Sequence, residues 1–256
     1  MLSVDELLLV YDAGYVPLGI VVGAAVFHVG IVGSRMANVE LVPLSQALLA
    51  AREVATSHMR DHATQLSASG VIGVQVEITA FEDRRHLARV VATGTAIRKI
   101  DREAPPAVPF VAGLSGQEFR LLVDGGYEPV SLVMGVCVYH IARKGLRTRA
   151  RNVRTTAELS NYTAALYEAR ELAMRRLQGE ALASDADGVV GVTISEKSHT
   201  WGAQAIEFFC MGTSIRLCRE ARIEQPSTVF SVRDLHVATD PTNLHHRSPR
   251  ATRKIG

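Results

Sequence analysis

The stretch AGYVPLGIVVGAAVFHVGIVG (13–33) decides the fold of this chain, because it occurs twice. It returns as GGYEPVSLVMGVCVYHIARKG (125–145), with the same Gly-Tyr start and the same aromatic–His pair. Three further segments return in the same order: ALLAAREVA (47–55) as ALYEARELA (165–173), GVIGVQV (70–76) as GVVGVTI (188–194), and ATGTAIR (92–98) as CMGTSIR (210–216). The offset is 112 residues in the first match and 118 in the other three. A period of this length is that of a domain rather than of a solenoid unit.

The repeat predicts the organisation of the whole chain. We expect a first copy over 1–100, a linker over 101–114, a second copy over 115–220 and a tail over 221–256. Three prolines make the linker semi-rigid, and the tail is basic and polar, which is typical of disorder.

Each copy is expected to contain the same series of elements. These are a short strand (6–11; 118–123), an apolar strand (18–29; 130–141), a long helix (44–67; 157–183), a strand after a glycine turn (71–78; 189–195) and a last strand interrupted at Gly-Thr (87–98; 204–217). This order predicts an α+β fold, with one long helix packed on a small, mostly antiparallel sheet. The apolar strands lack polar alternation, so both of their faces need cover. One helix per copy cannot provide it, and oligomerisation is therefore expected.

The composition excludes several classes of protein. At 256 residues, 47% hydrophobic and net charge +2, the chain is globular and has no strong overall field for nucleic acid or membrane. Its three cysteines form no CxxC motif, which favours a reducing compartment, and we expect a cytoplasmic protein. Residues 16–33 are apolar enough to resemble a membrane span, but their counterpart contains Glu128, Arg143 and Lys144, so no span is expected.

No catalytic motif is present in the sequence. The glycines match neither the Walker A nor the dinucleotide-binding pattern, and no nucleophile–base set stands out. We therefore expect that the protein is not an enzyme.

Two pairs of histidines are candidate ligands for a divalent metal ion. His28 and His140 both follow an aromatic residue at the end of the apolar strand, so they should occupy equivalent positions; the alternative is a structural or interface role. His58 and His62 form H-x-x-x-H on one face of the first helix, although Arg176 and Glu180 replace them in the second copy. Cys137, Cys210 and Cys218 are better explained as small buried hydrophobes than as metal ligands.

Charged residues suggest further contacts. The run from Arg143 to Arg154 holds six basic residues and no acidic one, so it could bind an anionic or protein partner, or face acidic neighbours in an assembly. Arg52 with Glu53, and Arg170 with Glu171, are interpreted as a repeated ion pair at a subunit contact.

Both copies resemble the YbjQ-like family, whose domain carries the name "putative heavy-metal-binding". The resemblance rests on the glycine-rich strand, the A-R-E or E-A-R segment of the helix, the G-x-x-G-V strand and the G-T-[AS] strand, and it covers about 1–99 and 115–218. It implies a small α+β domain that assembles into a pentameric ring. The family's glycine-rich loop before the helix is replaced here by 34–43 and 146–156.

Two hypotheses about function follow. The first is a non-enzymatic, ring-forming protein that binds a metal ion or small ligand; the second is an assembly scaffold that binds a protein or nucleic-acid partner through the basic loop 143–154 and the tail. Two domains per chain cannot tile one five-membered ring, so we expect either five chains as two stacked rings or three chains as one six-domain ring.

Overall fold

The computed structural model of the chain describes residues 2–28, 37–81, 87–101, 104–142, 160–198 and 204–218. Both copies lie within one compact unit, whose described residues run from 2 to 218. The predicted tail and the basic loop 143–154 lie outside the described residues.

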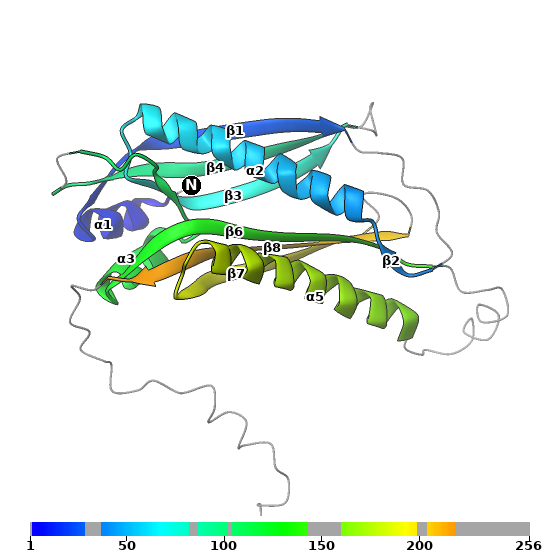
Figure 1. Cartoon of the computed structure of the whole chain (residues 1–256). Coiled ribbons are helices and arrows are strands. Elements are labelled where there is room, and N and C mark those ends of the chain that lie inside the picture. The colour runs from blue at the N-terminus through cyan, green and yellow to red at the C-terminus, as the bar shows by residue number, and fades with distance from the viewer. Residues whose placement is uncertain are drawn as a thin grey trace, which may run out of the picture. The chain divides into compact units, whose positions relative to one another are not determined.

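The predicted α+β fold, with one long helix on a mostly antiparallel sheet in each copy, is confirmed (Figure 1). The elements in chain order are α1 (Val4–Asp12), β1 (Tyr15–His28), β2 (Val39–Glu40), α2 (Val42–Gln65), β3 (Gly70–Ala80), β4 (Leu87–Lys99), β5 (Phe110–Val111), α3 (Gly116–Asp124), β6 (Tyr127–His140), α5 (Ser160–Ala183), β7 (Gly188–Ser198) and β8 (Ala205–Leu217). Helix α2 packs on β1 and β4, and α5 packs on β6 and β8.

Each sheet has a short edge strand that comes from outside its own copy. The first sheet has the order β1-β4-β3-β5, and β5 comes from the segment that was predicted as a linker. The second has the order β2-β6-β8-β7, and β2 comes from the first copy. The first copy and the segment between the copies therefore each add a short strand to the edge of a sheet.

The short first strand predicted in each copy is wrong, because both segments are helices. Ser3 and Ser115 each begin their helix with a capping box: the Ser3 hydroxyl accepts from Glu6 N, and the Glu6 carboxylate accepts from Ser3 N at 2.7 Å. Ser115 and Glu118 do the same for α3. The S-x-x-E pattern that directs these caps is visible in both copies of the sequence.

The predicted interruption at Gly-Thr is also wrong, because β4 and β8 are continuous there. The irregularity lies opposite, in β3 and β7, where the second glycine of each G-V-[IV]-G segment has positive φ: Gly73 at 63° and Gly191 at 61°. Gly94 faces this bulge, and a Cβ there would lie 2.5 Å from Val71 Cγ1. The Gly-Thr motif and the G-V-[IV]-G motif therefore meet at one β-bulge in each copy.

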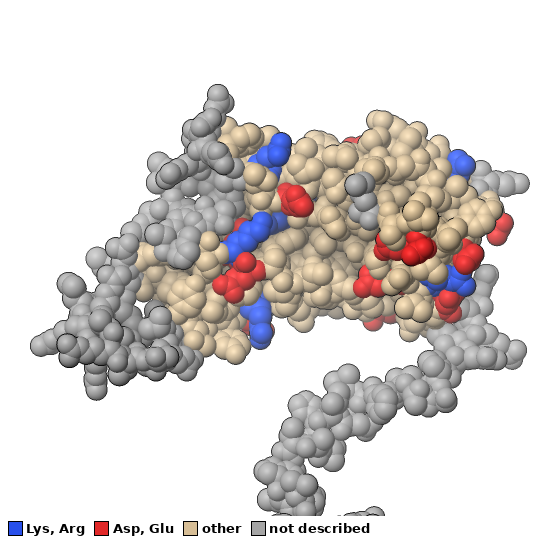
Figure 2. Space-filling view, turned by 180° about the vertical axis from the view of Figure 1, so that it is seen from behind, with Lys and Arg blue, Asp and Glu red and all other residues tan. Residues whose placement is uncertain are grey.

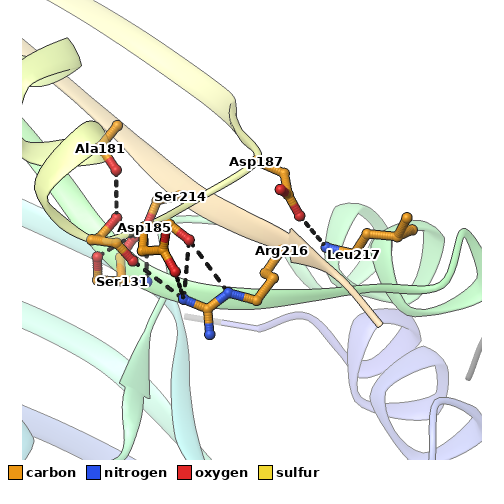
Figure 3. Close-up of polar contacts among 8 residues, drawn as sticks. Ser131, Ala181, Asp185, Asp187, Ser214, Arg216 and Leu217 are labelled. Carbon is orange, nitrogen blue, oxygen red and sulfur yellow. Dashed lines mark hydrogen bonds and ion pairs between the residues drawn. The ribbon is translucent and has the colours of Figure 1, made fainter. Parts of the chain in front are cut away.

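Each long helix ends in the same turn. Ser67 and Asp185 have positive φ after α2 and α5. In the second copy, Arg216 donates to the carbonyl oxygen of Asp185 at 3.1 Å, and Asp187 accepts from Leu217 N at 2.8 Å (Figure 3). Such contacts satisfy carbonyls that the end of a helix leaves unpaired.

Glycines in the repeated apolar strand set the distance between helix and sheet. A Cβ on Gly23 would lie 2.1 Å from the carbonyl oxygen of Ala55 in α2, and one on Gly135 would lie 2.0 Å from that of Ala173 in α5. Because the neighbouring atoms belong to helix backbone, no side chain can move aside to make room. Both long helices can approach their sheets this closely only over a glycine.

We predict that Gly135→Ala destabilises the protein, because the helix must move away from β6. The free energy of unfolding should fall by about 1–3 kcal/mol or more, as in other overpacked cores. Urea unfolding measures the change. Gly179→Ala is the matched control: nothing lies within 4 Å of a Cβ there, and alanine in a helix should raise stability by about 0.5–1 kcal/mol. Equal stability of the two variants would contradict the prediction.

Candidate functional site

The two copies contact each other through α2 and the second sheet. Leu41, Leu44 and Leu48, at the start of α2 and within it, pack with Val136, Val138 and Ala205 of the second sheet. A neighbouring cluster adds Leu132 and Met134 of β6 to the core beneath α2. Helix α5 covers the other face of β6. Strand β6 is therefore covered on both faces, as its apolar sequence requires.

A buried ion pair lies in this contact. The Arg52 side chain on α2 donates from Nη2 to the Glu207 carboxylate on β8, and the two side chains are 2% and 1% exposed. The Arg52 guanidinium also stacks on the Phe209 ring, 4.1 Å from its centroid. The predicted pairing of Arg52 with Glu53 is wrong, because the acidic partner comes from the other copy. Glu171, in turn, pairs with Arg175.

The contact also covers the free edge of β6. The N–H of Val138 donates to Ser45 Oγ at 2.9 Å, and its carbonyl accepts from Leu41 N at 2.8 Å. Val39 of β2 pairs with His140. The first copy thus provides side-chain and backbone partners for an edge that would otherwise be open to another chain.

Each long helix also binds the edge of a strand in its own copy through two side chains: α2 binds β1, and α5 binds β6. His58 and His62 of α2 contact β1: His58 Nδ1 lies 2.9 Å from the carbonyl oxygen of Ala24, and Val22 N–H donates to His62 Nδ1 at 3.4 Å. In the second copy, Arg176 donates to the carbonyl oxygen of Val136. Glu180 accepts from Met134 N at 2.6 Å.

These two side-chain pairs perform the same task with different chemistry. In each, the first residue is the donor and the residue one turn later is the acceptor. His58 must carry its proton on Nδ1 to donate, and His62 must leave Nδ1 unprotonated to accept. Neutral His62 then has its proton on Nε2, so neither of its ring nitrogens has a lone pair for a metal ion while the strand bond is made. The H-x-x-x-H spacing has a structural use here, and metal binding by this pair stays a prediction.

His28 and His140 occupy equivalent positions, as predicted from the repeat, since His28 pairs with Leu87 and His140 with Ala205. Their surroundings differ: His140 is buried beside β2, whereas His28 is exposed. Within the described ranges, no three His, Cys, Asp or Glu side chains group as a metal site would require. Metal binding by His28 and His140 stays a prediction.

A polar network that sequence reasoning missed joins β2 to α5. Glu40 accepts from Arg176 with both carboxylate oxygens, at 2.6 and 3.0 Å, and Tyr139 donates to Glu168 at 2.6 Å. Cys137 is buried beside them, and burial, followed by the negative charge of Glu40, raises the pKa of its thiol to about 12. In the sequence, one sign of this network was Arg176, a charged residue at the position equivalent to His58.

Two segments of the chain, residues 16–99 and 128–218, match the model of a family described as "Putative heavy-metal-binding", YbjQ. The chain belongs to the YbjQ family. Its two YbjQ copies confirm the tandem duplication that the sequence predicted. None of the helices in the described ranges has the length and apolar character needed to cross a bilayer.

Two relatives of this YbjQ protein are informative. The encapsulin nanocompartment protein Rv1762c of Mycobacterium tuberculosis is 36% identical over 234 residues, which are 90% of this chain and 89% of that protein. The UPF0145 protein MmarC6_1828 of Methanococcus maripaludis is 40% identical over 60 residues, which are 23% of this chain and 52% of that protein. The similarity to the first relative therefore includes both YbjQ copies and not one domain alone.

We predict that the contact between the YbjQ copies depends on the buried ion pair. Arg52→Met should lower the free energy of unfolding by about 3–5 kcal/mol, because it removes the guanidinium charge that neutralises the buried Glu207 carboxylate. The double variant Arg52→Met/Glu207→Gln should recover most of that loss, as urea unfolding at one chain concentration would show. Arg120→Met is the control, since Arg120 and Asp124 form a partly exposed pair worth less than about 1 kcal/mol. A loss no larger than in this control would refute the prediction.

We predict that Cys137 and Cys210 do not react with thiol reagents in the folded YbjQ protein. Burial raises the pKa of both thiols, that of Cys137 to about 12, so little thiolate forms near neutral pH. Because the folded state keeps the Cys137 proton, stability should fall as the pH rises from about 9 towards 12. Thiol titration before and after unfolding, and urea unfolding of Cys137→Ala across this pH range, measure both effects. Fast labelling of Cys137 at pH 8 in the native state would contradict them.

Proposed function

We propose that this protein is a non-enzymatic assembly protein whose chains join into a closed ring through repeated helix-on-sheet contacts. One observation carries the proposal: the first copy covers a sheet face of the second copy, while the corresponding sheet face of the first copy is exposed. Ile20, Val22 and Val26 lie on that exposed face of β1. A face that needs cover in one copy needs it in the other.

The comparisons support an assembly role. The name of the Mycobacterium tuberculosis relative places that protein with a nanocompartment, which is itself an assembly. We infer a comparable role for this chain, as a component or cargo of a larger protein shell, in the cytoplasm. Neither this name nor the family's description refers to a reaction.

The contact between the copies favours one of the two expected ring arrangements. It is head-to-tail: the helix face of one copy meets the sheet face of the next, and the two surfaces differ. Where the rotation between neighbouring copies closes, repeating such a contact along alternating copies gives one ring with an even number of copies. We therefore propose three chains in one six-domain ring rather than five chains in two stacked rings.

Metal binding, the property in the family's description, requires ligands from more than one chain in this proposal. The described part of one chain brings no three candidate ligands together. His28 is exposed at the end of β1, on the face that a second chain would cover. We propose His28 as one ligand of a metal ion whose other ligands come from the chain that covers this face.

Native mass spectrometry of the full chain, expressed without a histidine tag, tests this function. We expect a single species of three chains. Metal analysis of the same sample, and of the His28→Ala variant, should show bound divalent metal that the variant loses while the assembly persists. A monomer at micromolar concentration would refute the assembly role. An assembly without metal would refute the metal-binding part alone.

A further inference from the structure

The two copies differ in which of their equivalent surfaces are covered, and this difference identifies the surfaces that join one chain to the next. We infer that α5 of one chain docks on the exposed face of β1 and β4 of a second copy of the chain, in the way that α2 docks on β6 and β8 within the chain. The inference rests on the proposed assembly and names its contact surfaces.

The first surface is the receiving face of the sheet. In the second copy it consists of Leu132, Met134, Val136 and Val138 of β6 with Glu207 and Phe209 of β8; in the first copy the equivalent residues are Ile20, Val22, Ala24 and Val26 of β1 with Arg89 and Val91 of β4. Leu132, Met134 and Val138 are 9%, 4% and 0% exposed, whereas Ile20, Val22 and Val26 are 52%, 44% and 60% exposed. The same apolar face is therefore present in both copies, but it is covered only in the second copy.

The second surface is the docking face of the long helix. On α2 it consists of Leu44, Ser45, Leu48 and Arg52, all buried against the second copy; on α5 the equivalent residues are Tyr162, Thr163, Leu166 and Arg170. The α5 residues keep the same chemistry, with a large apolar side chain, a hydroxyl, a leucine and an arginine in the same order. Arg170 is exposed, and Tyr162, Thr163 and Leu166 are half-buried. A docking face of the same chemistry is thus present in the second copy, where it is only partly covered.

The short helices α1 and α3 show the same difference in exposure between equivalent residues at a separate place. Helix α1 packs on α3, and Glu6 of α1 accepts from the backbone N–H of Gly116 at the start of α3 at 3.2 Å. Gly116 is buried, whereas its equivalent Val4 is 74% exposed. In the same way, Leu9 of α1 is half-buried, whereas its equivalent Leu121 of α3 is 71% exposed. The surfaces that would continue the chain-to-chain contact are again the uncovered ones.

The strand edge offers a matching hydrogen bond. Within the chain, Ser45 Oγ accepts from the N–H of Val138. Thr163 is the equivalent of Ser45, and Val26 is the equivalent of Val138. Threonine retains the hydroxyl that serine uses, so Thr163 of one chain can accept from Val26 of the next.

Charge distinguishes the proposed contact from the one within the chain. Arg89 stands where the second copy has Glu207, so Arg170 cannot repeat the ion pair of Arg52. Glu77 of β3 lies opposite Val91 on the same face and is exposed, and Val91 is the equivalent of the Phe209 that Arg52 covers. Cross-strand neighbours lie within about 5.5 Å at Cβ. Glu77 is therefore the acidic partner that Arg170 meets on this face.

One side of the molecule has a broad surface area without charged side chains. On the side that faces away from the viewer of Figure 1, charged residues gather in two groups, and a broad area between them shows no acidic or basic side chain (Figure 2). Exposed apolar residues such as Ile20, Val22 and Val26 mark an interaction surface when they gather in one patch.

The first test replaces an apolar residue of the receiving face. Val26→Asp should raise the dissociation constant of the assembly on the order of 100-fold, because the contact would bury an unpaired carboxylate. Leu182→Asp is the matched control, since Leu182 is 80% exposed on α5 and its α2 equivalent, Thr64, is also exposed. Circular dichroism and the urea midpoint of both variants show whether each chain is folded. Dilution followed by mass photometry measures dissociation.

The second test adds the ion pair that the first copy lacks. Arg89→Glu places an acidic residue where the second copy has Glu207, so Arg170 of the neighbouring chain should bind it. We expect the assembly to tighten about 10-fold, and the gain should vanish in Arg89→Glu/Arg170→Gln. No gain, or a gain that does not depend on Arg170, would overturn the assignment of α5 to this face.

The third test separates a head-to-tail contact from a face-to-face one. In a Cys218→Ser background, chains with Val26→Cys and chains with Thr163→Cys should form a disulfide with each other when mixed, but neither should form one alone. The in-chain pair Ser45→Cys/Val138→Cys is the positive control. A disulfide between two Val26→Cys chains would overturn the inference. If the wild type assembles and Val26→Asp assembles equally well, this inference is also overturned, although assembly itself is not. A monomeric wild type would instead refute the proposed function.

Discussion

A small sheet with one helix on it has one uncovered face, and the rest of this structure depends on that constraint. The repeated strand carries apolar side chains on both faces, so each copy needs a second layer that it does not contain. The first copy supplies that layer to the second through α2, and Arg52, Ser45 and Leu48 all lie in this layer. The contact between the copies is therefore required by the sheets and is not an addition to two finished domains.

The same constraint explains which positions kept their chemistry. Gly23 and Gly135 are both glycine because the helix backbone lies directly over them. The residues that bind the strand edge were free to change from His58 and His62 to Arg176 and Glu180, because the edge requires only a donor followed by an acceptor. Steric demands in this fold fix the residue type, whereas hydrogen-bond demands fix only its role.

The sequence predicted most of the fold but little of the contact between the copies. Two copies of one pattern located the long helices and the paired strands to within a few residues. The short helices α1 and α3 were missed because nine-residue apolar segments fit a strand as well as a helix, and the capping boxes at Ser3 and Ser115 were not used. The partner of Arg52 could not be found from the repeat, because Glu207 is 155 residues away and its equivalent, Arg89, has the opposite charge.

That difference in charge also bears on the proposed contact between chains. Both long helices carry an arginine at the equivalent position, Arg52 on α2 and Arg170 on α5. Glu207 binds Arg52 within the chain, whereas Arg89 and Arg170 have like charges. In the proposed assembly, Arg170 must therefore avoid Arg89 and meet Glu77 instead. The two receiving faces share their apolar residues but differ in charge, and this difference would make the contact between chains distinct from the contact within a chain.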